Sequence, residues 1–146
     1  MNQRVGEWRQ FRPKGQALVE FALIFPVLIL MLVAIFDLGR LVFAYNDITN
    51  AGRTGVRVAI IDQTANSANT AAINQATSLG LVAADVSVVY KKADLSGICP
   101  TPRTLDCVAE VTVSYQWRAI TPIIGTVIGP IKVTAVSRMP IERIFP

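Results

Sequence analysis

The chain has 146 residues, no histidine, two cysteines and a formal net charge of +4. Residues 1–15 hold three of those four charges, so the remainder is almost neutral and lacks the basic stripe that neutralises nucleic-acid phosphates. This composition argues against nucleic-acid binding, and without histidine the usual proton acceptor of nucleophilic catalysis is missing. The length leaves room for one soluble domain of about 85 to 105 residues.

After this basic leader, residues 16–36 form an apolar run that only Glu20 and Pro26 interrupt. As a helix the run would be about 31 Å long, which matches a hydrocarbon core of about 30 Å. Because Lys and Arg gather on its N-terminal side, the positive-inside rule puts residue 1 in the cytoplasm and the bulk of the chain outside. The run is longer than that of a secretory signal peptide and ends in I-F-D-L-G-R, so we expect it to stay as a single-pass transmembrane helix.

Glu20 lies five residues into this run, where a carboxylate is costly unless a partner or a function retains it. Gly15 marks the junction between leader and span. One interpretation is a cut in front of the apolar run, between Gly15 and Gln16, which would leave the span on the mature chain. The other is a plain signal anchor in which Glu20 extends to the membrane interface.

A short basic leader, Gly15, four residues, Glu20 and a long apolar helix resemble the signal that prepilin peptidases cut after the glycine. More closely, G-Q-A-L-V-E-F-A-L-I-F-P-V-L-I-L and D-L-G-R-L-V-F-A-Y-N-D-I-T-N-A-G-R-T-G-V-R resemble the TadE-like family over residues 14–60. That family comprises pilin-like proteins of the bacterial tight-adherence (Tad, or Flp) pilus machinery. The chain departs from the pilin pattern at Gln16, where pilins usually present an apolar residue.

The resemblance implies that Gly15 and Gln16 flank the processing site, and that Glu20 meets the N-terminal amine of a neighbouring subunit and sets its register. It implies a minor pilin or pseudopilin that acts in pilus assembly or priming. Its partners would be prepilin peptidase, other pilin-like subunits and the Tad assembly platform. It would lie in the bacterial inner membrane with its outer domain periplasmic. The alternative is an unprocessed single-pass anchor whose outer domain binds a secretion or envelope component.

Residues 37–61 continue the helix as an amphipathic extension, so one helix is predicted over residues 16–61. Its apolar stripe is Leu38, Leu41, Tyr45, Ile48, Gly52, Gly55 and Ala59, and its polar face is Asn46, Asn50, Arg53 and Arg57. Ala51, Gly55 and Ala59 remove side-chain bulk along one line, which favours close packing on the downstream sheet over a subunit interface. We expect Arg53 and Arg57 to be solvated, with a basic docking site as the alternative.

Residues 62–146 are predicted to form an extracytoplasmic α+β domain. Polar residues 62–69 predict a loop, and Thr70 is expected to cap a short helix that ends at Gly80. Alternation predicts a strand over 106–118, with shorter strands at 86–91 and 131–138. The expected fold class is α+β and pilin-like: a long N-terminal helix, membrane-spanning in its first half and packed on a small antiparallel sheet.

Proline and glycine interrupt residues 121–130, so neither a helix nor a strand is predicted there. The apolar residues of this segment should fold over the sheet, and the alternative is contact with a partner or the membrane surface. They are Ile123, Ile124, Val127 and Ile128.

Cys99 and Cys107 are predicted to form a disulfide, worth about 2 to 3 kcal/mol in the chain-entropy model. Asp94, Asp106 and Glu110 lie close together in sequence, but their spacing matches no oxygen-ligand loop, so we expect them to be solvated. We therefore expect no metal, cofactor, small-molecule substrate or enzymatic activity.

Overall fold

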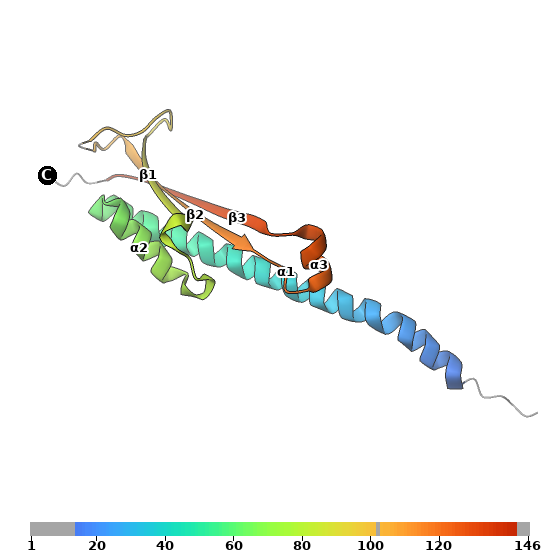
Figure 1. The fold of residues 1–146 in the computed structure, drawn as a ribbon. Helices are drawn as coiled ribbons and strands as arrows, with labels where there is room; N and C mark the ends of the chain where they lie inside the picture. The colour runs from blue at the N-terminus through green and yellow to red at the C-terminus, as the bar shows by residue number, and fades with distance from the viewer. Residues whose placement is uncertain (1–13, 102, 143–146) are drawn as a thin grey trace, which may run out of the picture.

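The computed structural model describes residues 14–101 and 103–142, so residues 1–13 of the predicted leader lie outside the described part of the chain. A long helix, α1 (Lys14–Asp62), is followed by α2 (Ala65–Gln75) and by strands β1 (Val86–Lys92) and β2 (Cys107–Trp117). A short helix, α3 (Pro122–Ile128), then leads into β3 (Ile131–Pro140). The predicted α+β class, a long N-terminal helix on a small antiparallel sheet, is confirmed (Figure 1).

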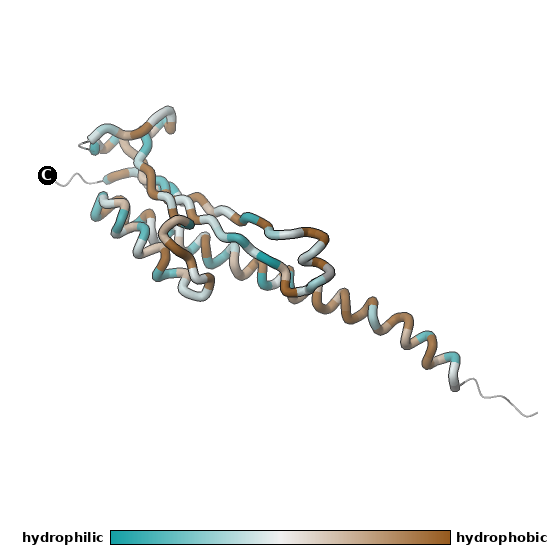
Figure 2. The backbone as a smooth tube through the Cα atoms, viewed as in Figure 1, coloured by the Kyte–Doolittle hydropathy of each residue, from teal (hydrophilic) through white to brown (hydrophobic). Residues whose placement is uncertain are grey.

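Helix α1 is continuous over 49 residues and about 73 Å long at the usual rise per residue. Its first half projects from the rest of the molecule, and its second half runs beneath the sheet (Figure 1). By length and composition it is apolar enough to cross a membrane. Figure 2 shows the apolar residues concentrated along the projecting half.

The sheet has the strand order β1-β2-β3, and both pairings are antiparallel. Val111 of the central strand lies opposite Val88 of β1 and Ser137 of β3. Helix α1 contacts β2 and β3, and α2 contacts β1 as well as α1, so the domain has a helical layer against one face of the sheet. The strand ends next to α3 lie toward the projecting helix, and those next to residues 93–106 lie at the far end of the molecule (Figure 1).

The close packing predicted for the small residues of α1 is confirmed. Ala51 and Ala59 are fully buried. A Cβ atom on Gly55 would lie 3.1 Å from the Ala68 carbonyl oxygen and 3.2 Å from a methyl group of Val111. The line of small side chains therefore meets both α2 and the central strand.

The apolar stripe predicted for α1 is wrong at its first positions. Leu38 and Tyr45 are exposed, whereas Asp37, Ala44 and Ile48 are buried. The buried face begins with a carboxylate and an alanine, which a search for large apolar residues does not select. The opposite face is as predicted, with Asn46, Asn50, Arg53 and Arg57 all exposed.

The predicted loop over residues 62–69 is also wrong, because α2 begins at Ala65. Ala68, Ala72 and Ala76 recur every four residues and are fully buried, so small side chains here allow two helices to approach closely. Thr70 is not a cap but lies within α2, where its hydroxyl donates to the Asn66 carbonyl. A short 3₁₀ turn, Thr77–Leu79, follows, and Gly80 ends it at a left-handed φ of 62°.

Residues 122–128 form helix α3, where no helix was predicted. Pro122 occupies its first turn, where proline costs no hydrogen bond, and Gly129 follows its end at a φ of 70°. Val127 is 81% exposed and Ile128 is also exposed, so these two side chains do not cover the sheet. Ile124 is half-buried.

Candidate functional site

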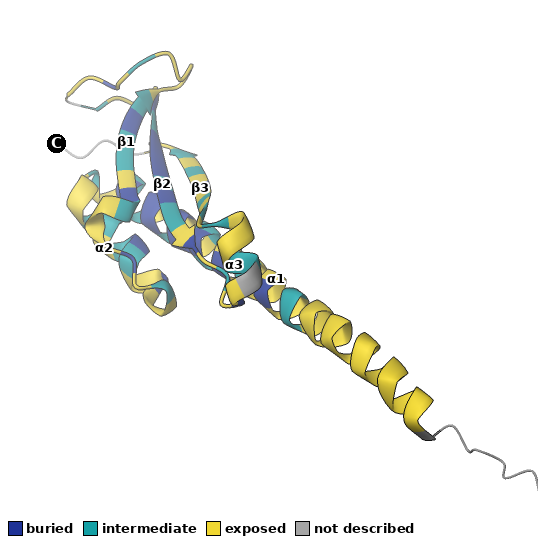
Figure 3. Ribbon diagram, turned by 45° about the vertical axis from the view of Figure 1, so that its right-hand side comes forward, coloured by how far each residue is buried: buried dark blue, intermediate teal, exposed yellow. Residues whose placement is uncertain are grey.

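The projecting half of α1 is the largest exposed apolar surface among the described residues. Every residue from 15 to 32 is exposed, and of residues 33–36 only Val33 and Ala34 are half-buried (Figure 3). A continuous apolar helix of this length requires cover by lipid or by other helices, because exposed apolar patches of this size are rare on soluble monomers.

The predicted processing and register residues lie together at the start of this surface. Gly15 is the second residue of α1, with open space where a side chain would be. The side-chain amide of the next residue, Gln16, donates a hydrogen bond of 3.3 Å to the carboxylate of Glu20, which lies one helical turn further on. Within residues 14–101 and 103–142, no salt bridge involves Glu20. Among the described residues, its charge is therefore met by one neutral amide.

The apolar run ends at Asp37, which ties the helix to the outer domain. One carboxylate oxygen accepts from the Ile120 backbone N–H at 3.1 Å, and the other accepts from the Thr121 N–H at 3.1 Å and from the Thr121 hydroxyl at 2.6 Å. Arg40 lies 3.4 Å away and is partly exposed. Asp37 is only 4% exposed, and these bonds, that of the Thr121 hydroxyl foremost, lower the pKa of its carboxyl group.

Sequence reasoning missed this role of Asp37. Its hydrogen-bond partners lie 83 and 84 positions further along the chain, so no local pattern points to them. One signal was available: Asp37 lies four, seven and eleven residues before Leu41, Ala44 and Ile48, on the same helical face.

The far end of the domain holds the predicted disulfide, which is confirmed between Cys99 and Cys107 with Cα atoms 5.8 Å apart. The loop it closes is docked onto the end of α1. The Arg103 guanidinium lies 3.4 Å from the centre of the Tyr90 ring and donates to the Gln63 carbonyl, and the Tyr90 hydroxyl donates to the Ala59 carbonyl. The predicted processing residues and the disulfide therefore lie at opposite ends of the molecule (Figure 1).

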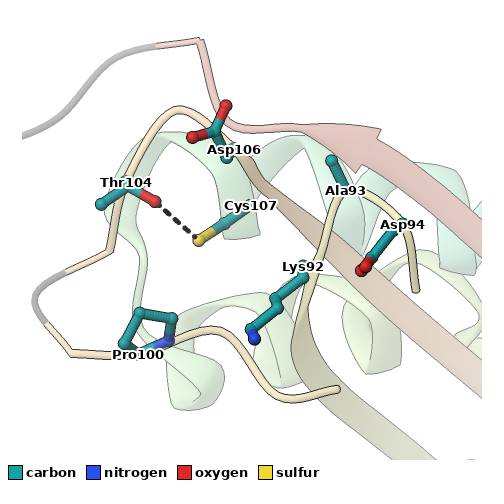
Figure 4. Close-up of a pocket in the computed structure, with 7 residues that line it drawn as sticks. All are labelled: Lys92, Ala93, Asp94, Pro100, Thr104, Asp106 and Cys107. Atoms are coloured by element: carbon teal, nitrogen blue, oxygen red, sulfur yellow. Dashed lines mark hydrogen bonds between the residues drawn. The ribbon is translucent and has the colours of Figure 1, made fainter. Parts of the chain in front are cut away.

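An open hollow of about 390 Å³ lies beside Cys107, between residues 92–94 at the end of β1 and the disulfide-closed segment that includes Pro100, Thr104 and Asp106 (Figure 4). Asp94 and Asp106 both line it and are exposed, as expected for solvated carboxylates. Two hydrogen bonds from Ser96 engage the Asp94 carboxylate and lower its pKa. Lys92 also lines the hollow, so its charges are mixed.

Glu110 is not part of this hollow, and the expectation that it is solvated is wrong. It lies on the outer face of β2 and is 8% exposed. Lys91 contacts one of its oxygens at 2.7 Å, and Arg138, directly opposite in the register, contacts the other at 2.5 Å. The bond from Lys91 is the main cause of the lowered pKa of Glu110, and burial opposes it. The three carboxylates that are neighbours in sequence therefore do not form one site.

The projecting helix and the attached domain define a class: a small α+β protein carried on a single apolar helix suited to membrane anchoring. Residues 15–57 match the family model described as TadE-like protein, which confirms the predicted resemblance and indicates a protein associated with the Tad pilus. The match includes Gly15, Glu20 and Asp37 and ends before α2. Comparison with curated proteins and with solved structures gave no match.

Proposed function

We propose that the protein is a minor pilin or pseudopilin of a Tad-type pilus, anchored in the bacterial inner membrane, that acts in assembling or priming the pilus. The observation that supports this best is the exposed apolar helix that begins at Gly15 and carries Glu20, a carboxylate with no salt bridge among the described residues. A surface of this kind is suited to lateral packing with similar helices.

In this proposal, prepilin peptidase cuts between Gly15 and Gln16. A Cβ atom built on Gly15 would meet nothing within 4 Å among the described residues, so the backbone at the cut is uncrowded there. The cut removes the leader and leaves a free amine on Gln16.

Glu20 then pairs with the N-terminal amine of a neighbouring subunit. Two unit charges 4 Å apart attract by about 4 kcal/mol at an effective dielectric constant near 20. The competing bond joins the neutral Gln16 amide to the charged carboxylate, and such a bond contributes about 1.5 to 3 kcal/mol net. Exchange of the amide for the amine is therefore favourable, and it selects the register in which the two groups meet.

The outer domain presents its strands, α3 and the disulfide-closed loop to other components, and the protein works by binding rather than by catalysis. Its partners in this proposal are prepilin peptidase, other pilin-like subunits and the Tad assembly platform.

The test is the N-terminal residue of the membrane-bound protein, determined by mass spectrometry in host cells with and without prepilin peptidase. We expect a start at Gln16 that depends on the peptidase. Gly15→Val should abolish this product, whereas Gly39→Val, at a second open glycine of the same helix, should not. A start at Met1 in both strains would contradict the proposal and favour the unprocessed anchor whose outer domain binds a secretion or envelope component.

A further inference from the structure

The segment between β2 and β3, residues 118–130, is held at the end of the apolar run. We call this segment, which includes α3, the foot. Asp37 binds it through the backbone of Ile120 and through the backbone and hydroxyl of Thr121. Figure 1 shows α3 at the end of the domain nearest the projecting helix. The foot thus lies where the apolar helix leaves the bilayer if residues 16–36 span it.

The foot also reaches below this level. Ile120 borders an open apolar hollow of about 220 Å³ together with Leu32, Val33 and Phe36 of α1. Leu32 lies five residues before Asp37, which corresponds to about 7 Å along the helix axis. Val33 and Ala34, alone among residues 15–36, are half-buried in the structure. Part of the foot therefore lies beside residues of the predicted span.

The exposed residues of the foot are suited to a membrane interface. Ile120, Val127 and Ile128 expose apolar side chains, and the segment contains no acidic residue. Arg118 within it and Lys132 just after it are exposed. Apolar side chains flanked by cations favour insertion at the level of anionic phospholipid headgroups. Single exposed apolar residues are common, but here they share one segment adjoining the apolar helix.

We propose that the foot inserts into the outer-leaflet interface of the bilayer that α1 crosses, as a second membrane contact of the outer domain. The occupant of this surface is phospholipid. With α1 as the first contact and the foot as the second, the domain is held at a fixed height and rotation about the helix. This inference rests on the membrane anchoring in the proposed function.

The test uses the full chain in vesicles of phosphatidylethanolamine and phosphatidylglycerol, labelled with an environment-sensitive fluorophore at one introduced cysteine. Both native cysteines are held in the disulfide, so the introduced thiol alone reacts. The variants are Val127→Cys and Ile128→Cys in the foot, Ile24→Cys in the middle of the apolar run, and Val136→Cys on β3. Val136 is a matched control: it is 48% exposed and lies five residues, about 17 Å, beyond the start of β3.

We expect blue-shifted emission, quenching by nitroxide-labelled lipid and loss of iodide quenching at residues 24, 127 and 128, with strong iodide quenching at residue 136. A lipid-facing probe at residue 24 with water-facing probes at 127 and 128 would overturn the inference and leave the membrane anchor intact. A water-facing probe at residue 24 would overturn both. A lipid-facing probe at residue 136 would overturn the specific assignment to the foot.

Discussion

Gly55 offers a direct test of the packing between α1, α2 and the sheet. A Cβ atom at this position would lie 3.1 Å from the Ala68 carbonyl oxygen and from the Ala72 Cβ, and 3.2 Å from a Val111 methyl group. Two of these neighbours belong to α2 and the third to the central strand, so relief requires movement of a helix or a strand. The same atom on Gly39 meets nothing within 4 Å.

The two substitutions separate two opposing contributions. Alanine for glycine in a helix interior favours folding by about 0.5 to 1 kcal/mol, and this contribution is common to both positions. Overpacking costs about 1 to 3 kcal/mol and applies only at Gly55. The free energy of unfolding should therefore rise for Gly39→Ala, and should be lower for Gly55→Ala than for Gly39→Ala by about 1 to 3 kcal/mol. Gly52→Ala should fall between them, because its closest contact, 2.9 Å, is to the Ser137 hydroxyl, which can rotate away.

The assay is thermal unfolding of the full chain in detergent micelles, followed by near-ultraviolet circular dichroism, to which the buried Trp117 and Tyr90 should contribute. For a domain of this size, 1 kcal/mol corresponds to a shift in Tm of roughly 4 to 8 °C. The reasoning would be refuted if Gly55→Ala proved as stable as Gly39→Ala.

Three further predictions concern Glu20, the disulfide and the buried carboxylate of Glu110. Glu20→Ala should enter the membrane at normal levels, because it makes the helix more apolar, yet fail to support pilus assembly; normal pili would count against the register role. Cys99→Ser should lower the free energy of unfolding by about 2 to 3 kcal/mol. Reductant should lower the free energy of unfolding of the native chain by a similar amount and should leave that of the variant unchanged. Lys91 and Arg138 lower the pKa of Glu110 in the folded protein. The stabilisation that ionised Glu110 contributes is therefore present above the unfolded-state pKa of about 4.3, and it is lost as pH falls through the lower folded-state pKa. Urea unfolding from about pH 5 downward should show a shallower loss for Glu110→Gln, and equal slopes would contradict the assignment.

Elements with a strong hydrophobic period could be predicted from the sequence. The apolar run and its extension gave one helix, and alternation in residues 106–118 gave the central strand, each within two residues of its ends in the structure. Composition and context were sufficient for the disulfide between Cys99 and Cys107, whose partners lie eight positions apart.

Elements made of small or mixed residues could not be predicted in the same way. The first residues of α2, A-N-S-A-N, have the short polar side chains of a loop, and the helix is supported by the contact of Ala68 and Ala72 with α1. The position of Glu110 in the alternating pattern of the strand is that of an outward-facing residue. Its burial depends on Lys91 and Arg138 from the two neighbouring strands. In both cases the deciding partner is distant in sequence.

The tie at Asp37 gives the continuous helix a mechanical consequence for assembly. Glu20 and Asp37 are 17 residues apart on one uninterrupted helix, which fixes them about 25 Å apart along its axis. Because the outer domain is bound at Asp37, an error of one helical turn in the pairing of Glu20 would displace the whole outer domain by about 5.4 Å relative to its neighbour. Contacts between outer domains would then fail together with the charge pair, so in the proposed assembly the selection of register by Glu20 would be reinforced by surfaces far from the membrane.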